Sequence, residues 1–180
     1  MRPRPPLPEL GFDHDLDRAE LRGLVAEIAA APDAWGDLVR IDADRRGFEQ
    51  LWRDGHVDIW VISWMSGHDT GFHDHDVSSG AVAVVEGEIV EERLVLGGGT
   101  VARRHAAGAV FDFDASHVHR MHQDAGRATV SIHAYSPPLM VVGQYSQDPS
   151  GRLVRTPEHG RKELCDRTIA GDSVQLTGAT

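Results

Sequence analysis

Two histidines one residue apart, His73 and His75, precede a long apolar run in the stretch "TGFHDHDVSSGAVAVVEGEIV". Side chains at positions i and i+2 of a strand point to the same face, so both imidazoles can reach one metal ion. The alternative interpretation is a pair of partly exposed histidines at a strand edge. Asp74 lies between them and points to the other face, so we do not expect it to bind the ion.

The neighbouring residues favour the metal site, because they follow the two signature spacings of the cupin superfamily. The first set is Gly67, His73, His75 and Gly87, and the second is Gly108, His119 and Gln123. His119 is therefore the expected third ligand. His117 shares its face in a regular strand and stays an alternative, whereas His122 is expected to be structural or to support a ligand from outside.

The expected ligand set is three histidines without a carboxylate. Cupins commonly carry a glutamate shortly after the second histidine, but here Gly80 occupies that stretch and the next glutamate is Glu86. Three histidines on a six-coordinate metal leave three positions open, as in non-haem Fe(II) dioxygenases. The same ligands could hold tetrahedral Zn(II) with a water.

The chain has 11 histidines, and those in polar contexts are expected at the surface. These are His14, His56, His68, His105 and His159.

The remaining pattern indicates which elements position the site. Apolar residues at helical spacing predict a helix over residues 17–31, with Asp17 and Glu20 at its start and Pro32 after it. A short second helix is expected over 33–40. Farther on, segments such as "VDIWVISWM" and "GAVAVVEGEIVEERLVL" are β-branched and apolar, which predicts short strands.

Short strands at this spacing predict an all-β fold, an antiparallel sandwich or barrel. Together with the two signature spacings, they indicate a cupin-type antiparallel β-barrel (jelly roll) over about residues 56–155, with the N-terminal helices packed outside. We expect an N-terminal arm and helices over 1–45, the cupin barrel over 46–156 and a polar C-terminal tail over 157–180.

The amino-acid composition argues against some classes of binding partner. A net charge of −10 argues against nucleic acid and anionic membranes, which need a basic face. The single cysteine, Cys165, allows no intrachain disulfide, and the start "MRPRPPLPEL" lacks the apolar segment of a signal peptide. No segment reaches the roughly 18 apolar residues of a membrane helix. The expected location is the cytoplasm.

Three stretches, "HDHDVSSGAVAVVEGEIVEE", "SHVHRMH" and above all "SIHAYSPPL", resemble the cysteine dioxygenase family of thiol dioxygenases, over roughly residues 45–150. The resemblance implies that the three signature histidines bind iron. It also implies that Ser131, His133 and Tyr135 form a relay beside the iron. These three residues alternate by two, so one strand face presents them together, and the alternative is a polar face open to water. If the face is buried, His133 can orient Tyr135 through a hydrogen bond.

Two positions depart from the better-known members of the family. Animal members carry a cysteine that crosslinks to the active-site tyrosine; Gly80 takes its place here, which resembles the bacterial members. Gln50 takes the place of the arginine that grips the substrate carboxylate, which resembles the branch that oxidises 3-mercaptopropionate. An amide makes a weaker contact than a guanidinium. We expect Gln50 and Arg53 to contact the substrate, with Arg45 and Arg46 as alternatives.

The expected enzyme is a cysteine dioxygenase-like Fe(II) thiol dioxygenase that oxidises a small thiol carboxylate with O2 to its sulfinic acid. Cysteine is placed slightly ahead of 3-mercaptopropionate. The cofactor is Fe(II), which Ni or Zn can replace in recombinant protein, and the partners are the thiol and O2. The alternatives are a non-redox Zn or Ni cupin and a non-catalytic binding module. The "SIHAYSPP" element argues against the first, and the complete set of histidines argues against the second.

Overall fold

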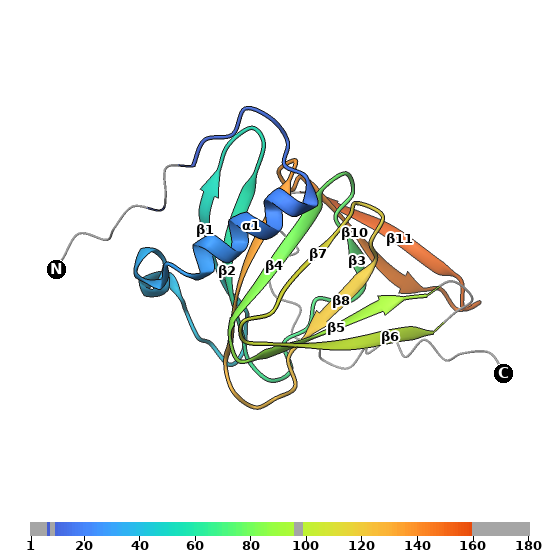
Figure 1. Ribbon diagram of the computed structural model, residues 1–180. Coiled ribbons are helices and arrows are strands. Elements are labelled where there is room, and N and C mark those ends of the chain that lie inside the picture. Colours follow the sequence, from blue (N-terminus) through green and yellow to red (C-terminus); the bar gives the residue numbers. More distant parts are fainter. Residues whose placement is uncertain (1–6, 8–9, 96–98, 160–180) are drawn as a thin grey trace.

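The computed structural model describes residues 7, 10–95 and 99–159, which fold as one helix, two short 3-10 turns and two β-sheets (Figure 1). The helix is α1 (Arg18–Ala29), and the turns are η1 (Pro32–Ala34) and η2 (Gly36–Leu38). The strands are β1 (Gly47–Arg53), β2 (Asp58–Trp64), β3 (His73–Asp74), β4 (Ser79–Glu86), β5 (Glu88–Leu94), β6 (Thr100–Ala106), β7 (Val110–Phe113), β8 (His119–His122), β9 (Thr129–Ser136), β10 (Val141–Gln147) and β11 (Leu153–His159).

The expected N-terminal helix is confirmed. The Asp17 carboxylate accepts hydrogen bonds from the backbone N–H groups of Ala19 and Glu20, and the Glu20 side chain accepts from the Asp17 backbone, which is a complete capping box. The second expected helix is wrong in type, because residues 32–38 form two 3-10 turns. Within the described residues, no helix is long and apolar enough to cross a membrane.

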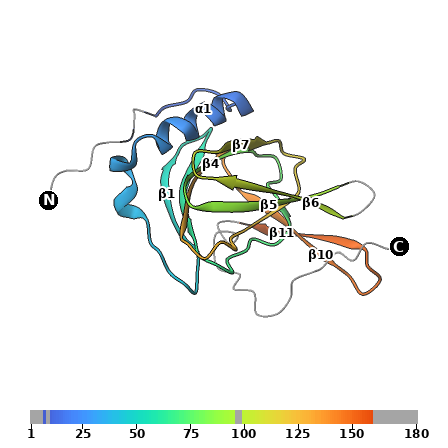
Figure 2. The ribbon, with the colours of Figure 1, turned by 60° about the horizontal axis from the view of Figure 1, so that its bottom comes forward.

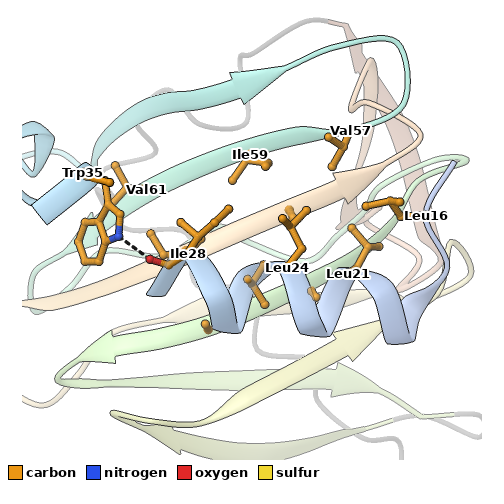
Figure 3. Packing of buried hydrophobic residues seen from close by; sticks show 14 of the residues in the cluster. Leu16, Leu21, Leu24, Ile28, Trp35, Val57, Ile59 and Val61 are labelled. Carbon is orange, nitrogen blue, oxygen red and sulfur yellow. Dashed lines mark hydrogen bonds between the residues drawn. The ribbon is translucent and has the colours of Figure 1, made fainter. Parts of the chain in front are cut away.

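Helix α1 lies against the outer face of the five-stranded sheet (Figures 1 and 2). Its buried side chains, Leu21, Leu24 and Ile28, point toward Ile59 and its neighbours on β2 (Figure 3). The Trp35 indole N–H donates to the Ile28 backbone oxygen at 2.8 Å, which ties the end of the helix to the turns that follow. The prediction that helical structure packs outside the sheets is therefore confirmed.

The two sheets form an open sandwich and not a closed barrel. One sheet has the order β1-β2-β9-β4-β7 and the other β11-β10-β3-β8-β5-β6, and all pairings are antiparallel. The jelly-roll cupin prediction is confirmed, but the strands do not close into one continuous sheet. The sandwich begins at β1, earlier than residue 56, and runs to His159. The tail expected over 157–180 lies outside the described residues after His159.

Side-chain alternation along β9 separates two environments. Ile132 and Ala134 point outward and pack under α1, whereas Ser131, His133 and Tyr135 point into the space between the sheets. Every residue of β9 is buried, because α1 covers one face and the second sheet faces the other. The polar relay face is therefore inside the protein and not open to water.

Candidate metal centre and pocket

Strand pairing brings the three signature histidines together. His73 on β3 stands directly opposite His119 on β8, and His75 follows two residues after His73. The ring centroids lie 4.8 Å apart for His73 and His75, 4.8 Å for His73 and His119, and 5.2 Å for His75 and His119. Each ring offers a nitrogen within 4.8 Å of the others, so one ion can contact all three.

The hydrogen bonds of these rings fit a metal ion. His73 donates from Nδ1 to the Gly71 backbone oxygen at 3.0 Å, and His119 places Nδ1 3.0 Å from a Glu91 oxygen. In the described part of the chain, the buried His75 Nδ1 and His119 Nε2 atoms have no hydrogen-bond partner. A buried polar atom without a partner is costly, and a metal ion at Nε2 of His119 removes that cost.

Burial also keeps the histidines in the form that binds metal. Burial, followed by repulsion from neighbouring rings, lowers the pKa of His73 and of His75 well below the ordinary value, and burial lowers the pKa of His119 as well. Neutral imidazole is the ligand form, so protons compete weakly for this site near neutral pH.

A carboxylate that the sequence analysis missed lies behind His119. Glu91 on β5 is 5% exposed and contacts His105, His117 and His119. Burial by itself raises the pKa of Glu91, but the hydrogen bonds from the three histidines hold that pKa well below its ordinary value. The signal was available in the alternation of β5, because Glu91 shares the inward face of Ile89.

Two of the histidines expected at the surface are buried, which corrects that prediction. His105 is 4% exposed because its ring stacks on Phe111 and its Nε2 faces Glu91. His68 is 5% exposed, and its Nδ1 accepts the Met65 backbone N–H at 2.9 Å. A polar sequence context does not predict exposure when tertiary packing covers the side chain.

The relay residues form a hydrogen-bonded row. The Trp64 indole N–H donates to Ser131 Oγ at 2.9 Å, Ser131 Oγ lies 2.8 Å from His133 Nε2, and His133 Nδ1 lies 3.2 Å from the Tyr135 hydroxyl. The Tyr135 ring lies 5.1 Å from the His75 ring, which places the end of the row beside the histidine cluster.

His73 of the cluster and His133 and Tyr135 of the relay line one pocket of about 320 Å³, part of it open to solvent. Its lining residues are Arg46, Ile62, Trp64, Thr70, His73, Met121, His133, Tyr135 and Gln144. The buried Arg46 guanidinium lies over the Trp64 ring, 5.1 Å from its centroid. The pocket therefore combines apolar side chains and the Arg46 cation with His73 from the cluster and His133 and Tyr135 from the relay.

The sequence matches the family described as cysteine dioxygenase type I over residues 7–148, which is most of the chain. The chain belongs to the cysteine dioxygenase type I family. The recognition made from the histidine and "SIHAYSPPL" stretches is thereby confirmed at the level of the family. Membership supports a dioxygenase with a metal cofactor.

Solved structures share the fold of this chain. The TT1209 protein of Thermus thermophilus has a TM-score of 0.51 at 14% identity, with 57% of this chain and 93% of that chain covered. A conserved protein from Klebsiella pneumoniae with a double-stranded β-helix domain has a TM-score of 0.50 at 14% identity, with 57% and 85% covered. At this identity the likeness shows the fold alone. No curated protein sequence matches the chain significantly.

In this cysteine dioxygenase family member, Gly80 lies directly beside the relay tyrosine. Gly80 pairs in register with Tyr135, and a Cβ atom there would lie 2.4 Å from the Phe113 ring and 3.1 Å from Tyr135 Cδ1. Gly80 has the position that resembles the crosslinking cysteine of animal members, and the Phe113 ring occupies the space that a side chain would take there.

Gln50 and Arg53, the two residues expected to contact the substrate, both contact Asp58. Gln50 donates from Nε2 to Asp58 at 2.7 Å, and Arg53 also pairs with the Asp58 carboxylate. Neither residue lines the pocket, whereas Arg46, one of the alternatives, does. A substrate role for Gln50 and Arg53 stays a prediction.

Asp74 points away from the histidine cluster, as expected. Its carboxylate accepts hydrogen bonds from Arg155 at 2.6 and 2.8 Å and from the Tyr145 hydroxyl at 2.7 Å. Asp74 ends the short strand β3, so this ion pair holds the backbone between His73 and His75.

Proposed function

We propose that the protein is an iron-dependent thiol dioxygenase that oxidises a small thiol carboxylate with O2 to its sulfinic acid. The observation that carries the proposal is the position of Tyr135, whose ring lies 5.1 Å from the His75 ring and whose hydroxyl lies 3.2 Å from His133 Nδ1. A phenol between a histidine cluster and a buried relay can contact a ligand held at the cluster. Membership of the cysteine dioxygenase type I family supports the same reaction.

His73, His75 and His119 would hold the ion through neutral imidazoles. When bound, Fe(II) supplies the redox chemistry that joins the thiol sulfur to O2. Overall, both oxygen atoms of O2 become bonded to sulfur, the sulfur loses four electrons, O2 gains them, and the thiol proton remains on the sulfinic acid. The balance needs no further reductant.

The relay orients the Tyr135 hydroxyl. Ser131 Oγ accepts the Trp64 N–H, so its own proton is available for His133 Nε2, and His133 then carries its proton on Nδ1 toward the Tyr135 oxygen. In this arrangement the phenolic proton can be directed at a ligand in the pocket. The low pKa of His133, which burial lowers to about 3, keeps the ring neutral in this role.

Arg46 supplies the positive charge for the substrate carboxylate. It is 7% exposed, lines the pocket with His73 and Tyr135, and contributes to the low pKa values of His73 and His133 through its charge. A carboxylate that enters a desolvated pocket needs such a partner, because an unpaired buried charge is strongly unfavourable. Trp64 and Met121 give the pocket an apolar wall against which the thiol can pack.

The test is anaerobic loading of metal-free protein with Fe(II), followed by O2 uptake and mass spectrometry with cysteine, 3-mercaptopropionate and cysteamine as separate substrates. We expect one O2 consumed for each sulfinic acid formed, with a thiol carboxylate preferred to cysteamine. Zn(II)-loaded protein is the control and should consume no O2. Iron-loaded protein that oxidises none of the three thiols would contradict the proposal and favour a non-redox cupin or a binding module.

A further inference from the structure

Glu91 is a buried carboxylate whose two oxygens are both held by histidines. Its Oε2 lies 3.1 Å from His105 Nε2, and its Oε1 lies 2.9 Å from His117 Nε2 and 3.0 Å from His119 Nδ1. The rings of His105 and His117 are themselves fixed by stacking on Phe111 and Phe113, with centroids 3.9 and 5.5 Å apart. The carboxylate therefore has little freedom to rotate.

These contacts determine where the histidine protons lie. An ionised carboxylate only accepts hydrogen bonds, so His105 and His117 carry a proton on Nε2 and His119 carries one on Nδ1. The lone pair of His119 is then on Nε2, which is the buried atom that has no hydrogen-bond partner among the described residues. Glu91 thus presents the lone pair of His119 to the histidine cluster.

The three expected ligands differ in the hydrogen-bond partner of their Nδ1 atoms. His73 donates from Nδ1 to a neutral backbone oxygen of Gly71, and His75 Nδ1 has no hydrogen-bond partner in the part of the chain that the structure describes. Among the described residues, His119 is the one of the three that is hydrogen-bonded to a carboxylate. A negative charge at this place raises the basicity of the ligand nitrogen.

We propose that Glu91 is the positioning residue of the metal centre, which fixes the tautomer and orientation of His119 and supplies a negative charge directly outside three neutral ligands. In many cupins a carboxylate binds the metal directly as a ligand. In this chain the Glu91 carboxylate on β5 is instead hydrogen-bonded to an expected ligand, His119. The proposal rests on the metal site of the proposed function but not on the thiol or on O2.

Two measurable quantities, the metal affinity and the reduction potential of bound iron, distinguish this role from simple packing. Loss of the negative charge should weaken metal binding, because the His119 nitrogen becomes a poorer donor. It should also raise the reduction potential of bound iron, because a nearby negative charge favours Fe(III) over Fe(II). A role in packing alone would change stability without moving the potential in a defined direction.

The first experiment uses metal-free wild-type protein and long-range 1H–15N correlation spectra of its histidine rings. We expect the His119 proton on Nδ1 and the His105 and His117 protons on Nε2. A His119 ring protonated on Nε2 would overturn the proposal. This measurement needs no variant, so it holds even if a substitution at Glu91 prevents folding.

The second experiment compares Glu91→Gln with the matched control Glu92→Gln. Glu92 is the next residue on β5, and its carboxylate faces away from the cluster, 3.6 Å from Arg120 and 3.4 Å from His122. Competition with a chelator should show a loss of Zn(II) affinity of about 10- to 100-fold for Glu91→Gln and little change for Glu92→Gln. The potential of bound iron should rise in Glu91→Gln alone. Equal affinities and equal potentials in the two variants would overturn the proposal.

These readouts separate the two proposals. A protein that shows the expected tautomers and the expected difference between the variants but oxidises no thiol would contradict only the proposed function. A protein that oxidises thiols while the two variants behave alike would contradict only the role of Glu91.

Discussion

His133 Nδ1 lies 3.2 Å from the hydroxyl oxygen of Tyr135, two residues farther along the same strand. The contact exists because alternate side chains of β9 share one face, and because the second sheet covers that face. It joins the buried Ser131–His133 pair to the ring that stands beside His75.

Replacing Tyr135 with phenylalanine should therefore lower thiol oxidation by about 10- to 100-fold while metal content stays the same, since the hydroxyl contacts the relay and the ring keeps its packing. Turnover and metal stoichiometry should be measured on the same samples. An unchanged rate would place Tyr135 outside the chemistry.

The choice of third ligand can be tested with a pair of alanine variants. His119→Ala should lose most of its bound metal, because it removes one of three ligands, whereas His117→Ala should keep it, because His117 contacts Glu91 and only supports the site. Elemental analysis after anaerobic loading gives the stoichiometry. The reverse result would make His117 the ligand.

Arg46→Gln should reduce kcat/KM for a thiol carboxylate by about 10- to 100-fold, since hydrogen bonds to a charged group contribute about 1.5–3 kcal/mol. Cysteamine has no carboxylate and should be nearly unaffected. The companion variant Gln50→Arg tests the prediction made from the resemblance. If Gln50 reads the carboxylate, this variant changes the ratio of cysteine to 3-mercaptopropionate; if Arg46 does, the ratio stays the same.

The stability of the metal-free protein should fall as the pH falls below about 6.5. Burial lowers the pKa of His133 to about 3, so between these values the unfolded chain binds a proton that the folded chain does not, and stability decreases toward acid. Urea denaturation from pH 4.5 to 6 should show a slope in His133→Gln that is shallower by up to about 1.4 kcal/mol per pH unit. Parallel curves for wild type and variant would contradict this assignment.

Gly80→Ala should lower the free energy of unfolding by about 1–3 kcal/mol, because the added Cβ would lie 2.4 Å from the buried Phe113 ring. A Phe113→Leu variant makes room at this place. The double variant should therefore be more stable than the sum of the two single losses, as a double-mutant cycle can show. Additive losses would mean that Phe113 does not fill this position.

The sequence by itself determined the local parts of the site. The spacing of His73 and His75 predicted that both rings point the same way, and the spacing of Ser131, His133 and Tyr135 places all three on one face of β9, since strand alternation is a property of the backbone. The capped helix that begins after Asp17 was predictable for the same reason, because a capping box depends on neighbours in the chain.

Tertiary structure decided which residues from distant strands contact these local groups. Glu91, His105 and Arg46 come from β5, β6 and the segment before β1. Only the pairing and stacking of strands brings Glu91 to His119, His105 to Glu91 and Arg46 to the pocket. Their sequence contexts are polar, so hydropathy placed His105 at the surface. Gln50 and Arg53 on β1 likewise contact Asp58 because β1 and β2 are neighbouring strands. Contacts of this kind depend on register and on the packing of distant strands, which residue types and local spacing do not specify.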